Sequence, residues 1–234
     1  DLKTTLKGLI KNKPLIAILC ASLIFMMNMM LVGAVNVYLF KDYFSSAGTL
    51  SFVSIAQTIA VLLCAPFIKT LTTKFGKKEM SLVGLLIASA AYFFLFFLKN
   101  IDAMTFIYIS FIGFIGFGLF NTVIWAFVTD VIDYQEYLTD LREDGTVYSV
   151  YSFARKVGQA LAGGIGGFAI AAVGYDAARE VQTDAALNGI HTLATLIPAA
   201  TYLIVLLILI FFYPLNKNRL AKMQEELAAK REHK

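Results

Sequence analysis

Charged residues, cysteine and proline are scarce in this sequence of 234 residues. Only 15% of the residues are charged and 59% are hydrophobic, with two cysteines and four prolines. Soluble globular domains carry about 25% charged residues, so the shortage of charge excludes an ordinary soluble fold and predicts a polytopic membrane protein. Cys20 and Cys64 both lie inside apolar runs. They therefore indicate neither a disulfide framework nor a cysteine metal site.

The motifs of common enzyme classes are also missing. The sequence has no His and Cys cluster at metal-ligand spacing, no Ser, His and Asp set within an apolar run, and no glycine-rich phosphate loop. Asp130, Asp133 and Glu136 have a spacing that suits Mg²⁺ in aspartate-rich lipid enzymes, but no second acidic cluster supplies the other half of such a site. We therefore expect no enzyme activity, no metal site and no cofactor.

Long uncharged runs supply most of the chain. A helix needs roughly 20 apolar residues to cross a bilayer, and four runs hold no Asp, Glu, Lys or Arg: 15–40, 50–68, 80–98 and 103–129. A fifth helix is predicted over about 146–175, where only Arg155 and Lys156 interrupt, and a sixth over 189–213, before Pro214. The fold class is therefore all-α, with a bundle of six transmembrane helices over residues 1–214.

The basic residues predict the orientation of this bundle. Fifteen Lys and Arg lie at one set of helix ends and three at the other, with Arg155 and Lys156 left out. Because short cytoplasmic loops retain Lys and Arg, both termini and residues 130–145 are expected in the cytoplasm. Topology explains the net charge of +4 without a nucleic-acid partner. The tail, 215–234, is predicted as a cytoplasmic amphipathic helix, with Leu220, Met223 and Leu227 on one face.

Polar residues inside the predicted spans are candidates for function, because they are costly in lipid. In the fifth span they recur at steps of three and four and share one face: Ser149, Ser152, Lys156, Gln159 and Gly163. Lys156 lies near the bilayer midplane if this helix begins at Thr146, or at the inner end of the span if the span begins at Val157. Gly163 and Gly167 lack side-chain bulk, which favours close helix contact or a sliding surface.

One face of the fourth span carries an amide and an indole. Asn121 and Trp125 lie four residues apart, and this pair suits a sugar through hydroxyl bonding and ring stacking. An ordinary interhelical hydrogen bond is the alternative for the amide.

An acidic block separates the fourth and fifth spans. Asp130 to Gly145 holds six carboxylates in sixteen residues. The stretch TDVIDYQEYLTDLREDGTVYSVYSFARKVGQALAGG resembles the signature of the glycoside-pentoside-hexuronide:cation symporter family, a branch of the major facilitator superfamily. The resemblance rests on Asp130, Asp133, Tyr134, Glu136, Arg142, Glu143 and Gly145.

The resemblance implies a C-terminal half. Family members have twelve helices in two bundles, so the six spans would be helices seven to twelve, beside an N-terminal bundle that holds the cation-binding carboxylates. The implied function is symport of a sugar or glycoside with Na⁺ or H⁺ by alternating access, in the cell (inner) membrane. Lys156 would lie near the cation site, while Tyr151 and Ser152 would face the sugar. Asn121 stands where a relative has tryptophan, so Trp125 is the candidate for ring stacking.

The acidic block is expected to form a cytoplasmic gate that pairs with basic residues of the other bundle. The gate residues are Asp130, Asp133, Tyr134, Glu136, Arg142, Glu143 and Arg155. Two alternatives stay open: a major facilitator transporter of a non-sugar solute, and a six-helix membrane protein that transports nothing.

Overall fold

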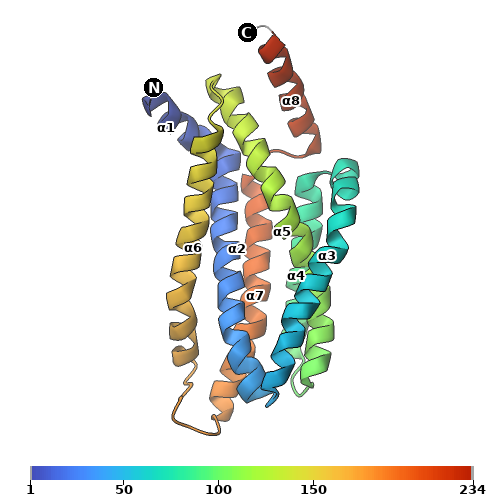
Figure 1. Ribbon diagram of the computed structural model, residues 1–234, viewed down its shortest axis with the longest axis vertical. Coiled ribbons are helices and arrows are strands. Elements are labelled where there is room, and N and C mark those ends of the chain that lie inside the picture. Colours follow the sequence, from blue (N-terminus) through green and yellow to red (C-terminus); the bar gives the residue numbers. More distant parts are fainter. Residues whose placement is uncertain (1, 233–234) are drawn as a thin grey trace.

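The computed structural model describes residues 2–232, and these residues form helices and connecting loops without a strand (Figure 1). The helices are α1 (Leu2–Lys11), α2 (Lys13–Tyr38), α3 (Leu50–Phe75), α4 (Lys77–Phe97), α5 (Ala103–Thr139), α6 (Asp144–Ala172), α7 (Asp184–Phe212) and α8 (Lys217–Glu232). Two short turns link α2 to α3: the π-helical η1 (Leu39–Tyr43) and the 3₁₀ η2 (Ala47–Thr49).

Side-chain caps fix where several helices begin. Asp102 accepts hydrogen bonds from the backbone N–H groups of Met104 and Thr105 at 3.0 and 3.1 Å, which starts α5. Asn12 accepts one from Leu15 N–H at 2.9 Å, which starts α2. These caps satisfy donors that the first helical turn leaves free. Gly76, with a φ of 106°, makes the sharp change of direction between α3 and α4.

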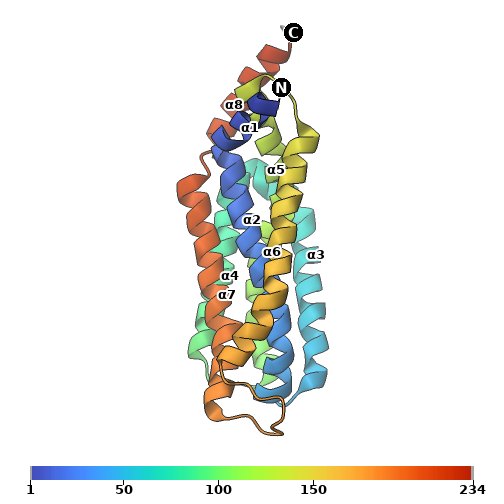
Figure 2. The same cartoon turned by 90° about the vertical axis from the view of Figure 1, so that its left-hand side faces the viewer.

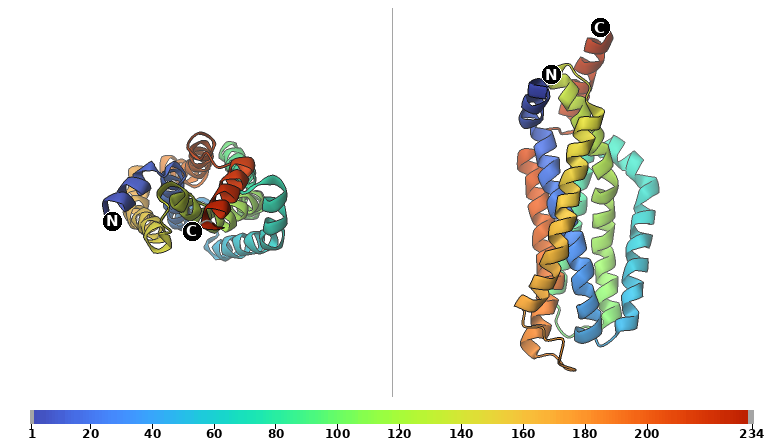
Figure 3. Two further views of the ribbon diagram at one scale, coloured as in Figure 1. Left: turned by 90° about the horizontal axis from the view of Figure 1, so that it is seen from above. Right: turned by 60° about the vertical axis from the view of Figure 1, so that its left-hand side comes forward.

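The long helices stand side by side, with α1 and α8 at one end (Figures 1 and 2). Neighbours in space follow the order α6, α2, α7, α4, α5, α3, so α3 and α6 lie at the two edges of the arrangement. The view along the bundle in Figure 3 shows the same separation of α3 from α6. Both edge helices therefore keep faces that no other helix of this chain covers.

Close backbone approach and an aromatic cluster hold the bundle together. A Cβ atom on Gly116 would lie 2.2 Å from the Gly84 carbonyl oxygen, so α4 and α5 touch backbone to backbone. A Cβ on Gly158 would lie 2.8 Å from the Leu23 carbonyl oxygen, which sets the α2–α6 contact. Phe25 of α2 stacks on Phe117 of α5, with ring centroids 5.2 Å apart. Small residues and aromatic packing together replace the hydrophobic drive that lipid does not supply.

Five helices, α2, α3, α4, α5 and α7, are long and apolar enough to cross a membrane. The predicted fifth span, 146–175, which corresponds to α6, is not confirmed by length and composition. α6 and α7 have the same length, 29 residues each. The apolar content of α6 is lower, because it contains Arg155, Lys156 and the polar and glycine residues around them.

The structure changes two expectations of the sequence. α5 continues to Thr139, so the first ten residues of the acidic block are helical and not a loop. The N-terminal residues form a separate helix, α1, that the uncharged runs did not indicate. The predicted tail contains helix α8, with Met223 and Leu227 buried. Residues 233–234 of the predicted tail lie outside the described residues.

Candidate functional site

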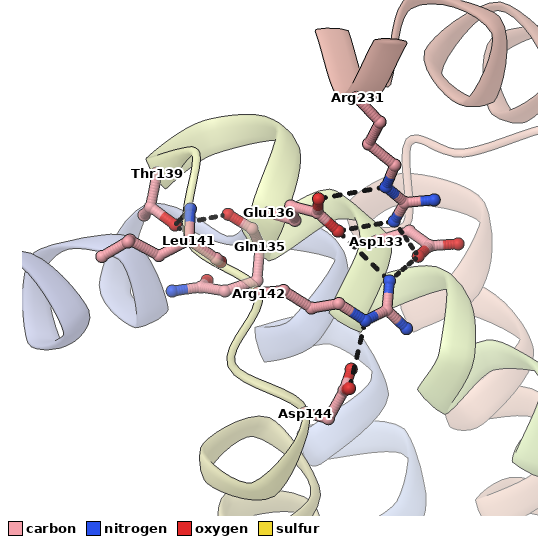
Figure 4. A network of polar contacts seen from close by, with 8 residues as sticks. All are labelled: Asp133, Gln135, Glu136, Thr139, Leu141, Arg142, Asp144 and Arg231. Atoms are coloured by element: carbon pink, nitrogen blue, oxygen red, sulfur yellow. Dashed lines mark hydrogen bonds and ion pairs between the residues drawn. The ribbon is translucent and has the colours of Figure 1, made fainter. Parts of the chain in front are cut away.

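Carboxylates and arginines form a network at the end of the bundle that holds α1 and α8 (Figure 4). Arg142, in the α5–α6 loop, donates from Nη1 to Asp133 and to Glu136, each at 3.1 Å. Arg231, near the end of α8, donates to both oxygens of Glu136, from Nε at 3.1 Å and from Nη2 at 2.5 Å. Two arginines from segments about 90 residues apart therefore share the carboxylates of α5.

Burial makes this network stronger than a typical surface ion pair. The side chains of Asp133 and Glu136 are 15% and 10% exposed, whereas those of both arginines are about 45% exposed. Hydrogen bonding to Glu136 raises the pKa of Arg231, so this guanidinium stays charged. Buried carboxylates that keep two charge-assisted partners avoid the desolvation cost of an unpaired charge.

Further contacts fasten α8 beside the network. Met223 and Leu227 bury the apolar face of α8. Tyr137 donates its hydroxyl hydrogen bond to Glu226 at 2.8 Å, and Lys230 pairs with Asp140 at 3.2 Å. The tail helix is thus docked on the end of α5 by one apolar face and several polar contacts.

Asp130 lies one helical turn below the network and has a different partner. It is 1% exposed, and Lys77 at the start of α4 donates to its Oδ1 at 2.6 Å. Its second oxygen, Oδ2, has no hydrogen-bond partner among the described residues. Lys77 therefore supplies the charge that allows a carboxylate to be buried here.

The remaining residues of the predicted gate lie at the edge of the network. Glu143 accepts from Gln135 Nε2 at 3.2 Å and from the hydroxyl of Thr5, which ties the α5–α6 loop to α1. Tyr134 packs against Tyr137, with ring centroids 6.1 Å apart. Both residues therefore lie beside the acidic end of α5.

Arg155, which was grouped with the gate residues, lies apart from this network. Its guanidinium carbon lies 5.0 Å from the ring centroid of Trp125 and 5.8 Å from that of Tyr151. Its Nη2 also approaches the Met26 sulfur at 3.5 Å. Eleven residues of helix separate Arg155 from Asp144 at the start of α6, about 17 Å along the axis. The residue joins the aromatic pair of α5 and α6 and not the carboxylates.

Of the four predicted sugar-facing residues, Trp125 and Tyr151 contact each other. Trp125 and Tyr151 make an edge-on pair with ring centroids 5.8 Å apart, and Trp125 is 49% exposed while Tyr151 is buried. Asn121 and Ser152 are half-buried on the same two helices. Trp125 therefore offers an exposed ring at the α5–α6 junction, whereas Tyr151, which was expected to face the sugar, is covered by this chain.

Lys156 lies near the middle of α6 and is exposed. Among the residues that the structure describes, it has no hydrogen bond or ion pair. Gln159 and Gly163, which share its face, are exposed too. Lys156 and Gly163 therefore face away from the other helices of this chain, whereas Gln159 Nε2 approaches the Met26 sulfur of α2 at 3.8 Å.

Two functional partners escaped the sequence reasoning. Lys77 follows Gly76 in the basic loop KTLTTKFGKKE, and Arg231 stands four residues after Leu227 on the tail. Lys77 could have been found as a lysine directly after a turn glycine. Arg231 could have been found as an arginine one helical turn beyond the apolar face of the tail. Within residues 2–232, no three His, Cys, Asp or Glu side chains are placed to hold a metal ion together.

Comparison with known proteins gives the family. The model of the MFS/sugar transport protein family matches residues 2–217. The chain is 29% identical to the glucuronide carrier protein homolog of Escherichia coli (strain K12), over 97% of this chain and 50% of that protein. It is 30% identical to a putative sulfoquinovose importer of the same organism, over 94% and 47%, and 30% identical to the isoprimeverose transporter of Lactiplantibacillus pentosus, over 90% and 44%.

The chain spans about half the length of the curated relatives that it matches. The match nevertheless covers almost all of this chain, and it agrees with the helical fold, the apolar spans and the acidic signature. The chain is a multi-pass membrane protein that belongs to the MFS/sugar transport family, in the glycoside-pentoside-hexuronide symporter branch of the major facilitator superfamily.

Proposed function

We propose that this chain is the C-terminal six-helix bundle of a transporter that moves a sugar or glycoside together with Na⁺ or H⁺ by alternating access. The observation that carries the proposal is the family match over residues 2–217, joined to an exposed polar stripe on α6. Relatives named as a glucuronide carrier, a sulfoquinovose importer and an isoprimeverose transporter support a sugar-type cargo. Such a chain is a carrier and not an enzyme.

In this proposal α6 is the fifth of the six spans, the one that length and apolar content do not identify. It packs along α2, and only one stripe of its surface is buried, at Val147, Tyr151, Gly158, Ala162, Gly166 and Ile170. The exposed surface of α6 carries Lys156 and Gln159 near its middle, and these two side chains are costly in lipid. A second bundle covers this surface and that of α3, the least buried of the five apolar spans.

Lys156 is the proposed coupling residue. It is a charge near the middle of α6 without an acidic partner among the described residues, and an intramembrane lysine usually pairs with an acid. Carboxylates of the second bundle supply that partner. Binding or release of the coupling cation at those carboxylates then changes how strongly they attract Lys156, which links ion occupancy to the position of the two bundles.

The network around Glu136 is the proposed cytoplasmic gate, in a cell (inner) membrane protein with both ends of this segment in the cytoplasm. The sequence predicted that these carboxylates pair with basic residues of the second bundle. Because Arg142 and Arg231 already occupy them, gating requires an exchange of partners. The α8 helix therefore belongs to the gate, together with Asp130, Asp133, Tyr134, Arg142 and Glu143.

Uptake by vesicles that contain the complete transporter tests the function. Labelled sugars, sugar acids and organic solutes are offered under a Na⁺ gradient and, separately, a proton gradient. We expect one gradient to drive accumulation of a sugar or glycoside, and accumulation of a non-sugar solute alone would reject the proposed cargo.

A lysine variant tests the coupling. Lys156→Ala should insert normally and lose cation-driven accumulation, because the charge that responds to the cation is gone. Lys222→Gln, which changes an exposed lysine on α8, is the matched control. Accumulation by Lys156→Ala at the level of this control would reject the coupling role.

A further inference from the structure

Arg155 is a second cation inside the bundle without an acid. Every ion pair among the described residues lies toward one of the two ends of the bundle, and none includes Arg155 or Lys156. A charged side chain within a membrane span is costly and almost always has a partner or a water-filled cavity. Lys156 projects from the exposed face and can reach a second bundle. Arg155 is half-buried within this bundle. Its acidic partner is therefore a ligand that enters the bundle.

The surroundings of Arg155 hold it in place and leave most of the N–H donors of its Nη groups unoccupied. The guanidinium lies 5.0 Å from the Trp125 ring centroid and 5.8 Å from that of Tyr151, so both rings attract the cation. Its Nη2 contacts the Met26 sulfur at 3.5 Å, which is a weak acceptor. The buried Nε has no hydrogen-bond partner. A guanidinium carries five N–H donors, and these contacts use few of them.

A guanidinium whose remaining Nη donors lie in one plane fits one class of ligand. Carboxylate, sulfonate and phosphate groups accept two parallel hydrogen bonds from arginine, and these bonds are stronger than neutral ones. The exposed half of Trp125 beside the guanidinium is an apolar and aromatic surface that suits a sugar ring. The two features together match a sugar that bears an acidic group.

We propose that Arg155 binds the carboxylate or sulfonate of an acidic sugar, while Trp125 contacts the sugar ring. This inference rests on the proposed function, because it names the substrate class of the same transporter. Arg155 is thereby a substrate-binding residue, and Lys156 keeps the separate role of responding to the coupling cation. Arg155 and Lys156 can have different roles because adjacent residues lie about 100° apart around a helix and therefore face different surroundings.

Competition for uptake by the complete transporter tests this assignment. Methyl glucuronide and methyl glucoside, which differ in the acidic group alone, compete against the labelled substrate that the vesicles accumulate best, and sulfoquinovose is compared with glucose in the same way. We expect the wild type to prefer the acid of each pair. Arg155→Gln should reduce the preference for the acid at least tenfold, and Arg155→Lys should retain part of it. Arg179→Gln, an exposed arginine at the other end of the bundle, should change nothing.

The possible results separate the two proposals. A wild type that prefers the neutral sugars, or an Arg155→Gln variant that keeps the preference of Arg179→Gln, overturns the role of Arg155 while leaving sugar transport intact. An Arg155→Gln variant that loses both ligands equally also overturns it, because a pair with a protein carboxylate predicts that result. Accumulation of no sugar of either kind by the wild type rejects the proposed function itself.

Discussion

Docking of α8 on the acidic end of α5 can be tested through the Glu136–Arg231 contact. The contact has two charge-assisted hydrogen bonds, at 3.1 and 2.5 Å. Hydrogen bonds to charged groups contribute about 1.5–3 kcal/mol, whereas an exposed ion pair contributes about 0–1 kcal/mol. Because Glu136 is 10% exposed and Arg231 is 46% exposed, we expect a value between these ranges, about 1–2 kcal/mol.

Amide hydrogen exchange of α8 in the purified complete transporter measures this free energy, since exchange reports how often the helix opens. Arg231→Gln should accelerate exchange in α8 roughly 5- to 30-fold, which corresponds to about 1–2 kcal/mol. Glu136→Gln should do the same. The double variant should exchange about as fast as either single variant, because the two side chains act in one contact.

The matched control is Lys222→Gln. Lys222 lies on the same helix, is 78% exposed and stands 3.9 Å from Glu226, so its loss should leave α8 exchange unchanged. If Arg231→Gln exchanged no faster than Lys222→Gln, the apolar face of α8 alone would hold the tail. The network would then have no part in docking.

Three further predictions concern the stability of the complete transporter, measured by thermal unfolding in detergent. Gly116→Ala should destabilise by about 1–3 kcal/mol from overpacking, because its Cβ would lie 2.2 Å from a carbonyl oxygen of α4, whereas Gly33→Ala meets open space and should not. Lys77→Gln should cost about 3 kcal/mol by leaving the Asp130 charge buried and unpaired, and adding Asp130→Asn should recover most of it; no recovery would contradict the pairing. Asn12→Ala should lower the free energy of unfolding by about 2–3 kcal/mol, since Asn12 caps α2 and donates a hydrogen bond to the Val131 carbonyl oxygen of α5 at 3.0 Å. An unchanged melting temperature would refute this.

The sequence predicts the spans well because bilayer thickness sets them. Uncharged runs of about 20 residues located five apolar helices, and a step of three and four residues located the amphipathic tail. The end of α5 was placed ten residues early because charge marks the end of an apolar run and not the end of a helix. Those ten residues stay helical, and Arg142 and Arg231 neutralise the carboxylates there.

Helix contacts could not be predicted from the glycine pattern. Gly163 and Gly167 have the spacing of a contact motif, yet a Cβ on either would meet nothing within 4 Å. The contacts with α2 fall instead at Gly158 and Gly166, one face away. Both pairs supply small residues, so the choice between them depends on where α2 lies, which is a tertiary fact. The position of Arg155 has the same origin, because the rings of Trp125 and Tyr151 attract it.

The shared carboxylates also constrain how the proposed cytoplasmic gate would work. Glu136 already accepts three hydrogen bonds from two arginines, and a carboxylate has about four acceptor sites. A basic residue of a second bundle therefore binds there by replacing Arg142 or Arg231 more readily than by adding to them. Replacement exchanges one charge-assisted contact for another, so the two states differ by little free energy, and a small difference in ligand affinity is enough to shift their populations. If Arg231 is the residue replaced, α8 loses a docking contact whenever the bundles close on this side, which couples the tail to the transport cycle.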